Sequence, residues 1–490
     1  TNAVTGIADA YLDSVPLLVF TGQVGRQSIG KDAFQEADTV GITAPITKYN
    51  YQIRETADIP RIVTEAYYLA RTGRPGPVEI DLPKDVSILE VTEINDPSLN
   101  LPHYHESEKA TDEQLQELLT ELSVSKKPVI IAGGGINYSG SVDIFRAFVE
   151  KYQIPVVSTL LGLGTIPISH ELQLGMAGMH GSYAANMALV EADYIINLGS
   201  RFDDRVVSNP AKFAKNAVVA HIDIDAAELG KIVKTDIPIL SDLKVALSRL
   251  LQLNKVKTDF NDWIKTVIEN KEKAPFTYEP QNHDIRPQET IKLIGEYTQG
   301  DAIIVTDVGQ HQMWVAQYYP YKNARQLITS GGMGTMGFGI PAAIGAKLAQ
   351  PNKNVIVFVG DGGFQMTNQE LALLNGYGIT IKVVLINNHS LGMVRQWQES
   401  FYEERRSQSV FDVEPNFQLL AEAYGIKHVK LDNPKTLADD LKIITEDEPM
   451  LIEVLISKSE HVLPMIPAGL HNDEMIGLHF TDKNEEVDNA

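Results

Sequence analysis

The feature that most constrains this chain is a repeated alternation of short apolar runs with helical patterns. Residues 111–253 contain the runs "PVIIAGGG", "IPVVST", "DYIINLGSR" and "AVVAHIDID", each beside a stretch of helical periodicity. Residues 286–458 repeat the pattern with "DAIIVTDVGQ", "RQLITSGG", "VIVFVGDGG", "IKVVLINN" and "PMLIEVLI". Apolar strands that alternate with helices are typical of a parallel, doubly wound sheet. The sequence therefore predicts an α/β fold with parallel sheets flanked by helices.

The N-terminal segment also alternates predicted strands with a predicted helix, but it has fewer of them. Its predicted strands are 16–22 and 76–82, and a helix over 58–73 lies between them. The helix shows apolar residues at helical spacing, and Gly73 and Pro75 end it. Polar and charged stretches separate the three segments. We predict domains over 1–90, 108–253 and 284–460, followed by a tail over 461–490.

Composition narrows the class of protein. A chain of 490 residues is too long for one core. The chain has 42 Lys and Arg against 64 Asp and Glu, so its net charge of −22 argues against nucleic-acid binding. No run of eighteen apolar residues is present, which predicts no membrane span. The absence of cysteine excludes disulfides and thiolate metal sites and is compatible with a reducing cytoplasm, where we expect the protein to reside.

Two predicted strands end on small polar side chains 27 residues apart. The run 354–360 ends at Asp361, which stands between glycines, and the run 379–386 ends at Asn387 and Asn388. Ligands of open parallel sheets bind at the carboxyl ends of the strands. Carboxylate and amide oxygens suit Mg²⁺, and glycines after the strand leave backbone N–H groups free for a phosphate. Each motif alone is more often a plain turn, but the pair predicts a diphosphate bridged by Mg²⁺.

This arrangement, "GDG" followed after about 25 residues by "NN", resembles the signature of the thiamine-diphosphate enzymes. The resemblance implies that Asp361, Asn388 and the backbone carbonyl of Ser390 hold Mg²⁺. The implied contacts of thiamine diphosphate are Gln310, His311, Met336, Gly360, Asp361, Gly362, Gly363, Asn388, Ser390, Leu391, Gly392 and Met393. Taken alone, His311 is more often a helix-capping or surface histidine. Met336, implied as the wedge under the thiamine, could equally be a core residue.

A closer resemblance, over nearly the whole chain, is to the catalytic subunits of acetolactate synthase (acetohydroxyacid synthase). The matching stretches are "GKDAFQEADTVGIT", "GRPGPVEIDLPKDV", "GMHGSYAAN", "GSRFDDRV" and "LGMVRQWQ". The resemblance implies three consecutive domains, namely an incomplete pyrimidine-binding domain, a central FAD-associated domain and a pyrophosphate-binding domain. It also implies a transferase that decarboxylates pyruvate and joins the product to a second 2-keto acid. Pyruvate gives 2-acetolactate and 2-oxobutyrate gives 2-aceto-2-hydroxybutyrate, on the way to valine, leucine and isoleucine.

The central segment is informative about its cofactor. A nicotinamide fingerprint would need glycines at 133, 135 and 138, and position 138 is tyrosine. The family resemblance implies FAD instead, without a net redox role. The implied FAD residues are Arg74, Gly133, Gly135, Thr159, Leu160, Met179, His180, Gly199, Arg201, Asp203, Arg205, Asp223, Ile224 and Asp242. Without the family, "RFDDR" is more often a solvated cluster of ion pairs.

The resemblance also assigns the surroundings of the reaction. Gln35, with Phe34 beside it, would border the reaction site from a partner subunit. Lys84, Arg205, Met393 and Trp397 would line the substrate entrance, although Trp397 could equally be a core aromatic residue. The implied assembly is a homodimer or homotetramer, with a small regulatory subunit as a possible partner.

The chain also departs from the family. The glutamate that activates the family's cofactor lies N-terminal to the segment with which this chain begins, and no residue here matches it. Thr1 opens directly into a helical pattern, so we expect a fragment that is inactive or unstable. Losing a positioned acid–base group costs about 10²–10⁴ in rate. Gly25 and Arg26 stand where many relatives have a proline. The alternatives are a pyruvate oxidase-like enzyme and a non-catalytic cofactor-binding protein. The sequence leaves the acceptor preference and feedback regulation open.

Overall fold

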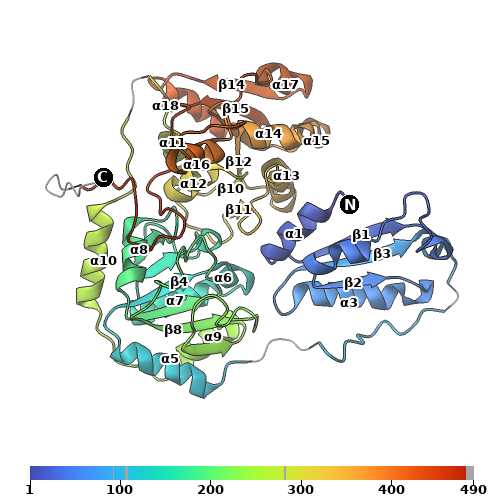
Figure 1. Ribbon diagram of the computed structural model, residues 1–490, viewed down its shortest axis with the longest axis horizontal. Helices are drawn as coiled ribbons and strands as arrows, with labels where there is room; N and C mark the ends of the chain where they lie inside the picture. Colours follow the sequence, from blue (N-terminus) through green and yellow to red (C-terminus); the bar gives the residue numbers. More distant parts are fainter. Residues whose placement is uncertain (92, 105–108, 281–282, 482–490) are drawn as a thin grey trace. The chain divides into compact units, whose positions relative to one another are not determined.

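The computed structural model describes residues 1–91, 93–104, 109–280 and 283–481 (Figure 1). These residues form two units, which are described separately. One unit is Thr1–Glu108 with Ser330–Thr335, and the other is Lys109–Thr329 with Met336–Ala490. Together they contain three sheets in which all strand pairs are parallel. The predicted α/β class with parallel sheets is confirmed, while the predicted domain boundaries stay a prediction.

The first unit is built on a three-stranded sheet of order β1-β3-β2. Helix α3 packs on this sheet with Ile62, Ala66, Leu69 and Ala70 buried, and three of these four lie at the predicted apolar positions, whereas Leu69 was not among them. Strand β2 was not predicted, because its sequence "YNYQ" is polar and only half-buried. The strands are β1 (Leu17–Gln23), β2 (Tyr49–Gln52) and β3 (Pro77–Pro83), and the helices are α1 (Val4–Leu12), α2 (Thr39–Thr43), α3 (Ile59–Arg71) and α4 (Lys84–Ile88).

The segment Ser330–Thr335 belongs to this unit although it is distant in sequence. The two carboxylate oxygens of Asp13 accept hydrogen bonds from the backbone N–H groups of Gly331 and Gly332, each at 2.8 Å. Asp13 is buried, so these two charge-assisted bonds fix the segment to helix α1 and the turn after it.

The middle part of the second unit is a six-stranded sheet of order β6-β5-β4-β7-β8-β9. The four central strands are those predicted. The two edge strands were missed because both are short, and one carries a proline, which is tolerated at an edge. The strands are β4 (Pro128–Ala132), β5 (Val156–Ser158), β6 (Gln173–Met176), β7 (Tyr194–Leu198), β8 (Val218–Asp223) and β9 (Ile237–Leu240). The helices are α5 (Asp112–Val124), α6 (Gly134–Tyr138), α7 (Val142–Tyr152), α8 (Tyr183–Glu191), α9 (Leu243–Gln252) and α10 (Asn261–Lys273).

The C-terminal part of the second unit repeats this architecture, with the order β11-β10-β12-β13-β15-β14. The edge strand β14, "KHVKL", was missed because three of its five residues are basic. The strands are β10 (Ile303–Thr306), β11 (Leu327–Thr329), β12 (Val355–Gly360), β13 (Lys382–Asn387), β14 (Lys427–Leu431) and β15 (Met450–Leu455). The helices are α11 (Pro287–Tyr297), α12 (Gln310–Tyr318), α13 (Gly339–Ala349), α14 (Asp361–Thr367), α15 (Leu371–Tyr377), α16 (Gly392–Phe401), α17 (Phe417–Ala423) and α18 (Leu437–Asp440).

Strand β12 shows why this sheet is covered on both faces. Val355, Val357 and Val359 pack into one hydrophobic core, and Ile356 and Phe358 pack into another. Successive side chains of a strand point to opposite faces, so a strand that is apolar throughout needs a core on each side. The carboxyl ends of β10, β12 and β13, which are neighbours in the sheet, therefore remain the open edge where a site can form. Among the described residues, no helix is long and apolar enough to cross a membrane.

Candidate cofactor and metal sites

The three implied Mg²⁺ ligands lie together at the carboxyl edge of the C-terminal sheet. Strands β12 and β13 are parallel neighbours, so Asp361, which follows one, lies beside the residues that follow the other. Oδ2 of Asp361 accepts a hydrogen bond from the backbone N–H of Ser390 at 3.0 Å. Oδ1 of Asn388 accepts one from Oγ of Ser390, also at 3.0 Å. The spacing of 27 residues thus corresponds to two adjacent strand ends.

The electrostatics of Asp361 suit a cation. Its side chain is 1% exposed, and burial raises its pKa to about 7, helped by the negative charge of Glu414 and opposed by N–H donors from Ser390 and Gly362. Within the described residues, no ion pair joins Asp361 to a basic side chain. A buried carboxylate without a compensating charge is costly unless a cation accompanies it. With an amide and a carbonyl oxygen beside it, the donor set fits Mg²⁺.

The structure excludes a surface position for His311. The residue is 5% exposed, and burial lowers its pKa to about 4, opposed by Asp307, so the ring is neutral at neutral pH. A Cβ built on Gly309 or Gly360 would lie 3.1 Å or 3.2 Å from Cε1 of the ring, so both glycines make room for it. Nε2 has no hydrogen-bond partner among the residues that the structure describes. An orphaned nitrogen at this edge fits a polar cofactor group, and the diphosphate contact itself stays a prediction.

The side-chain amide of Gln310 makes three hydrogen bonds within the protein. Its Nε2 donates to Oε1 of Gln396 and to the carbonyl of Glu460, both at 2.8 Å, and its Oε1 accepts from Nδ2 of Asn388 at 3.0 Å. The side-chain amide is therefore fully engaged with protein groups. Gln310 supports Asn388, and its predicted contact to the diphosphate remains untested.

Met336 and Leu391 meet at Gly362. A Cβ built on Gly362 would lie 2.5 Å from Cδ2 of Leu391 and 3.7 Å from Cε of Met336. Met336 is 37% exposed, which argues against the alternative that it is a core residue. The structure thus brings the implied thiamine residue Met336 next to the implied diphosphate turn.

Asp307 is a residue of this site that the sequence analysis missed. It follows strand β10, is 1% exposed, and its Oδ2 accepts the backbone N–H groups of Gly337 and Gly339 at 2.9 Å each. A Cβ on Gly363 would lie 2.4 Å from its Oδ1. Asp307 therefore fixes the start of α13 against α14. The available signal was "TDVGQ", in which an aspartate ends a strand as in "VGDGG".

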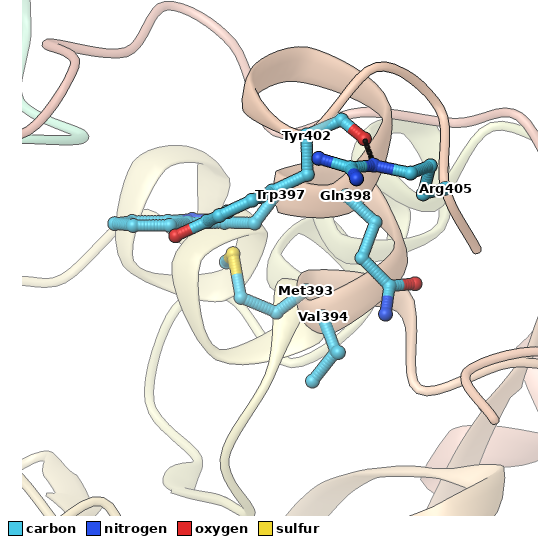
Figure 2. Close-up of a pocket in the computed structure, with 6 residues that line it drawn as sticks. All are labelled: Met393, Val394, Trp397, Gln398, Tyr402 and Arg405. Atoms are coloured by element: carbon cyan, nitrogen blue, oxygen red, sulfur yellow. Dashed lines mark hydrogen bonds between the residues drawn. The ribbon is translucent and has the colours of Figure 1, made fainter. Parts of the chain in front are cut away.

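Two of the four implied entrance residues line one cavity. Met393 and Trp397 border a space of about 590 Å³, and Figure 2 shows them with the other lining residues, which come from α16 and the turn after it: Val394, Gln398, Tyr402 and Arg405. Trp397 is half-buried, so it is not a core residue. Arg205 is 59% exposed and pairs with Asp204, and Lys84 belongs to the first unit. The entrance roles of all four stay predictions.

Phe34 and Gln35 also belong to the first unit. The side chain of Phe34 is 89% exposed, and Gln35 has a positive φ of 65°, which is uncommon for residues other than glycine. Their implied role at a reaction site shared with a partner subunit stays a prediction.

All implied FAD residues except Arg74 follow the carboxyl ends of the six strands of the middle sheet. Gly133 and Gly135 follow β4, Thr159 and Leu160 follow β5, Met179 and His180 follow β6, Gly199, Arg201, Asp203 and Arg205 follow β7, Asp223 and Ile224 end or follow β8, and Asp242 follows β9. Arg74 is described with the first unit, where its Nε donates to Oγ of Ser14 at 3.0 Å. Because parallel strands share one carboxyl edge, the second unit brings these residues to one rim.

Two features of this rim fit a large polar cofactor. A Cβ on Gly133 would lie 2.2 Å from the carbonyl oxygen of Gly199, so the turns after β4 and β7 approach as closely as glycines allow. His180 is buried and its Nδ1 has no partner among the described residues. Asp242 also has a structural role that the sequence analysis did not assign, since its Oδ1 caps helix α9 by accepting from the N–H groups of Lys244 and Val245. The FAD assignment stays a prediction.

Comparison with known proteins tests the identity of this fold. The C-terminal TPP-binding domain of thiamine pyrophosphate enzymes matches residues 307–454, their central domain matches 115–250, and their N-terminal TPP-binding domain matches 1–42. The chain is 98% identical over all its 490 residues to the acetolactate synthase large subunit of Lactococcus lactis subsp. lactis (strain IL1403), and covers 85% of that protein.

The chain belongs to the acetolactate synthase large-subunit family. More distant members of the acetolactate synthase family agree with this. The chain is 45% identical to acetolactate synthase 1, chloroplastic, of Nicotiana tabacum, with 96% of the chain and 72% of the relative covered. It is 41% identical to the acetolactate synthase isozyme 3 large subunit of Escherichia coli (strain K12), with 97% and 85% covered. The predicted function, a thiamine-diphosphate-dependent acetolactate synthase, is confirmed at the level of the family.

Proposed function

We propose that this acetolactate synthase chain works with Mg²⁺ and FAD in addition to thiamine diphosphate. Its substrates are pyruvate and a second 2-keto acid, which is either pyruvate or 2-oxobutyrate. The observation that carries the proposal is the contact of Asp361, Ser390 and Asn388 at two adjacent strand ends, within the part of the chain that matches the C-terminal TPP-binding domain. A buried carboxylate with a raised pKa, beside amide and carbonyl oxygens, is a site made for a cation.

In this proposal Asp361, Asn388 and the carbonyl of Ser390 would hold Mg²⁺, which would neutralise negative charge on the diphosphate. The neutral His311 donates or accepts at the diphosphate through its free Nε2. Residues 360–363 and 391–393 form the rest of the cradle, and Met336 supports the thiamine. When bound, thiamine diphosphate supplies the nucleophilic carbon and the electron sink for the decarboxylation. The chain's own contribution is to position the diphosphate, because binding this group holds the reactive carbon of the cofactor in a fixed place.

Substrate access is proposed through the cavity beside Trp397 and Met393. The cavity is lined mainly by apolar atoms of α16, which suits the short alkyl group of a 2-keto acid. Lys84 and Arg205 are proposed to contribute positive charge for its carboxylate. Gln35 and Phe34 are proposed to complete the reaction site from a second copy of the chain.

FAD is proposed to bind along the carboxyl edge of the middle sheet. The free Nδ1 of His180 and the guanidinium groups of Arg201 and Arg205 support this, because phosphates pair readily with arginine. The assembly is proposed to be a homodimer or homotetramer in the cytoplasm. Since several relatives are named large subunits, a small regulatory subunit is the proposed partner.

The test is a product assay with pyruvate alone and with pyruvate plus 2-oxobutyrate, in the presence of thiamine diphosphate, Mg²⁺ and FAD. In a version of the chain extended upstream to include the family's activating glutamate, we expect 2-acetolactate in the first case and 2-aceto-2-hydroxybutyrate as an additional product in the second, without consumption of oxygen. The present chain, in which no residue matches that glutamate, should give at least about 100-fold less product. The matched control is Asp361→Asn, which should lose the activity at least about 100-fold because the cofactor diphosphate is no longer bridged. Release of peroxide from pyruvate would show an oxidase instead.

A further inference from the structure

A chain of three side-chain amides leads from the implied metal ligand Asn388 into the protein core. Nδ2 of Asn388 donates to Oε1 of Gln310 at 3.0 Å, and Nε2 of Gln310 donates to Oε1 of Gln396 at 2.8 Å. All three residues are buried, and Gln396 is completely inaccessible. Gln396 lies on α16, and the sequence analysis did not assign it a role. Solvent therefore does not compete for these hydrogen bonds.

The far end of this amide chain is anchored on backbone groups whose polarity cannot change. Oε1 of Gln396 accepts from the backbone N–H of Val462 at 2.9 Å, and its Nε2 donates to the carbonyl of the same residue at 3.1 Å. A backbone N–H only donates and a carbonyl only accepts, so the orientation of the Gln396 amide is fixed. In the opposite orientation, Nε2 of Gln396 would face the N–H of Val462, which is also a donor, and Oε1 would face the carbonyl of Val462, which is also an acceptor.

The fixed orientation of the Gln396 amide also determines the orientation of the Gln310 and Asn388 amides. Gln310 faces two acceptors, Oε1 of Gln396 and the carbonyl of Glu460, so it must present Nε2 to them and Oε1 to Asn388. Asn388 must then present Nδ2 to Gln310, which leaves its Oδ1 on the side of Ser390. An amide that could turn over would offer a cation its NH₂ group, which cannot bind one.

The packing around Gly392 holds the amides of Gln310 and Asn388 in place, while the hydrogen bonds decide which way each amide faces. A Cβ on Gly392 would lie 2.1 Å from Oε1 of Gln310 and 2.7 Å from Nδ2 of Asn388. The carbonyl of Glu460 is held from a second side by Nη2 of Arg395 at 2.9 Å. The backbone anchors, residues 460 and 462, lie outside the range 307–454 that matches the TPP-binding domain.

We propose that Gln396 is a positioning residue of the magnesium site, which sets through Gln310 the atom of Asn388 that faces the cation. This inference rests on the proposed function, because it takes Asn388 as a ligand of Mg²⁺. Gln396 touches neither the metal nor the cofactor. Its effect is on the affinity for Mg²⁺, and partners of this kind typically change metal affinity by about 10–100-fold.

The test is a calorimetric titration of Mg²⁺ into the full chain at saturating thiamine diphosphate. We expect Gln396→Leu to weaken Mg²⁺ binding about 10–100-fold, because Gln310 and Asn388 can then turn over. Gln396→Met, which is closer to glutamine in length and flexibility, replaces it where the leucine variant does not fold. The matched control is Gln326→Leu. Gln326 is 3% exposed and donates to the carbonyls of Gly300 and Ala302 at the amino end of β10, at the opposite edge of the sheet, so its loss should leave the Mg²⁺ affinity unchanged.

A second measurement separates orientation from general damage. In an Asn388→Asp background both side-chain oxygens of residue 388 accept, so either can face the cation, and Oε1 of Gln310 faces another acceptor. Gln396→Leu frees Gln310 to turn its Nε2 toward the new carboxylate, so it should then weaken Mg²⁺ binding less than about threefold. An equal loss in both backgrounds, or unchanged affinity in Gln396→Leu, would overturn the role of Gln396. Asp361→Asn tests the site itself. If Asp361→Asn binds Mg²⁺ and thiamine diphosphate normally, the proposed metal site is wrong. If Asp361→Asn loses binding while Gln396→Leu binds Mg²⁺ normally, the metal site stands and only the role of Gln396 is refuted.

Discussion

The carboxylate of Asp361 accepts a hydrogen bond from the backbone N–H of Ser390 at 3.0 Å, across 29 residues of sequence. This bond joins the ends of strands β12 and β13. It brings the buried carboxylate of Asp361 next to Ser390, whose hydroxyl donates to Oδ1 of Asn388.

Asp361→Asn should make the protein without cofactors more stable and should abolish the binding of Mg²⁺ and thiamine diphosphate. Burial and the charge of Glu414 disfavour the ionised carboxylate, so a neutral amide should raise the free energy of unfolding at pH 8 by about 1–3 kcal/mol. Chemical denaturation and calorimetry measure the two effects. Asp307→Asn is the matched control, and we expect it to destabilise the protein, since Asp307 accepts N–H groups from Gly337 and Gly339. A loss of stability in Asp361→Asn equal to that of the control would contradict the account.

The affinity for Mg²⁺ should rise with pH and level off above about 7. The pKa of Asp361 is raised from 3.8 to about 7, so below pH 7 the cation must displace a proton, and affinity should fall by about tenfold per pH unit. The same shift gives the protein without cation a stability contribution that is full below pH 4 and is lost as the pH rises through 7. Calorimetry in two buffers of different ionisation enthalpy, at pH 6 and 8, measures the released proton. Equal affinities at both pH values, with no proton released, would show that Asp361 is not the ligand.

His180 should make the protein sensitive to acid. Burial lowers the pKa of His180 from 6.5 to about 4, with a smaller contribution from the charge of Arg205. A depressed pKa means that stability is full above pH 6.5 and is lost as the pH falls through 4, by roughly 3 kcal/mol. Denaturation curves without FAD at pH 7, 6 and 5 should therefore show a smaller loss for His180→Gln. His283→Gln, at an exposed histidine, is the control and should keep the pH dependence of the original protein. The same pH dependence in His180→Gln would refute this assignment.

Two glycine substitutions should act in opposite directions. Gly392→Ala places a methyl group against the amides of Gln310 and Asn388, so we expect weaker Mg²⁺ binding and a lower melting temperature. Gly345 lies inside helix α13 with nothing within 4 Å of a built Cβ. Gly345→Ala should therefore stabilise the protein by about 0.5–1 kcal/mol and leave Mg²⁺ binding unchanged. Thermal unfolding and Mg²⁺ titration of both variants check this pair. Normal Mg²⁺ affinity in Gly392→Ala would show that the amides tolerate displacement.

The fold could be predicted where strands are apolar throughout. Strands such as β12 and β13 are buried on both faces, and their composition shows it directly. The missed strands, β2, β6, β9 and β14, are short edge strands of their sheets. An edge strand is held by backbone hydrogen bonds on one side only and tolerates polar residues, so its side chains carry little signal.

The site residues could be predicted where a metal-ligating side chain stands directly after an apolar strand. Asp361 and Asn388 stand directly after apolar strands, and the topology brings such residues together. Gln396 and Asp307 could not be assigned in this way, because their roles depend on which side-chain and backbone groups they meet in three dimensions. The full use of the Gln310 amide within the protein was likewise invisible in the sequence, since its partner Glu460 is 150 residues away.

The most direct test of the metal site is a crystal structure of the protein with thiamine diphosphate and Mn²⁺ in place of Mg²⁺, with the cation located by its anomalous scattering. The account predicts one peak at about 2.0–2.3 Å from the carboxylate of Asp361, Oδ1 of Asn388 and the carbonyl oxygen of Ser390. A cation bound away from these three oxygens, or an Asn388 amide that turns its nitrogen toward the peak, would contradict it.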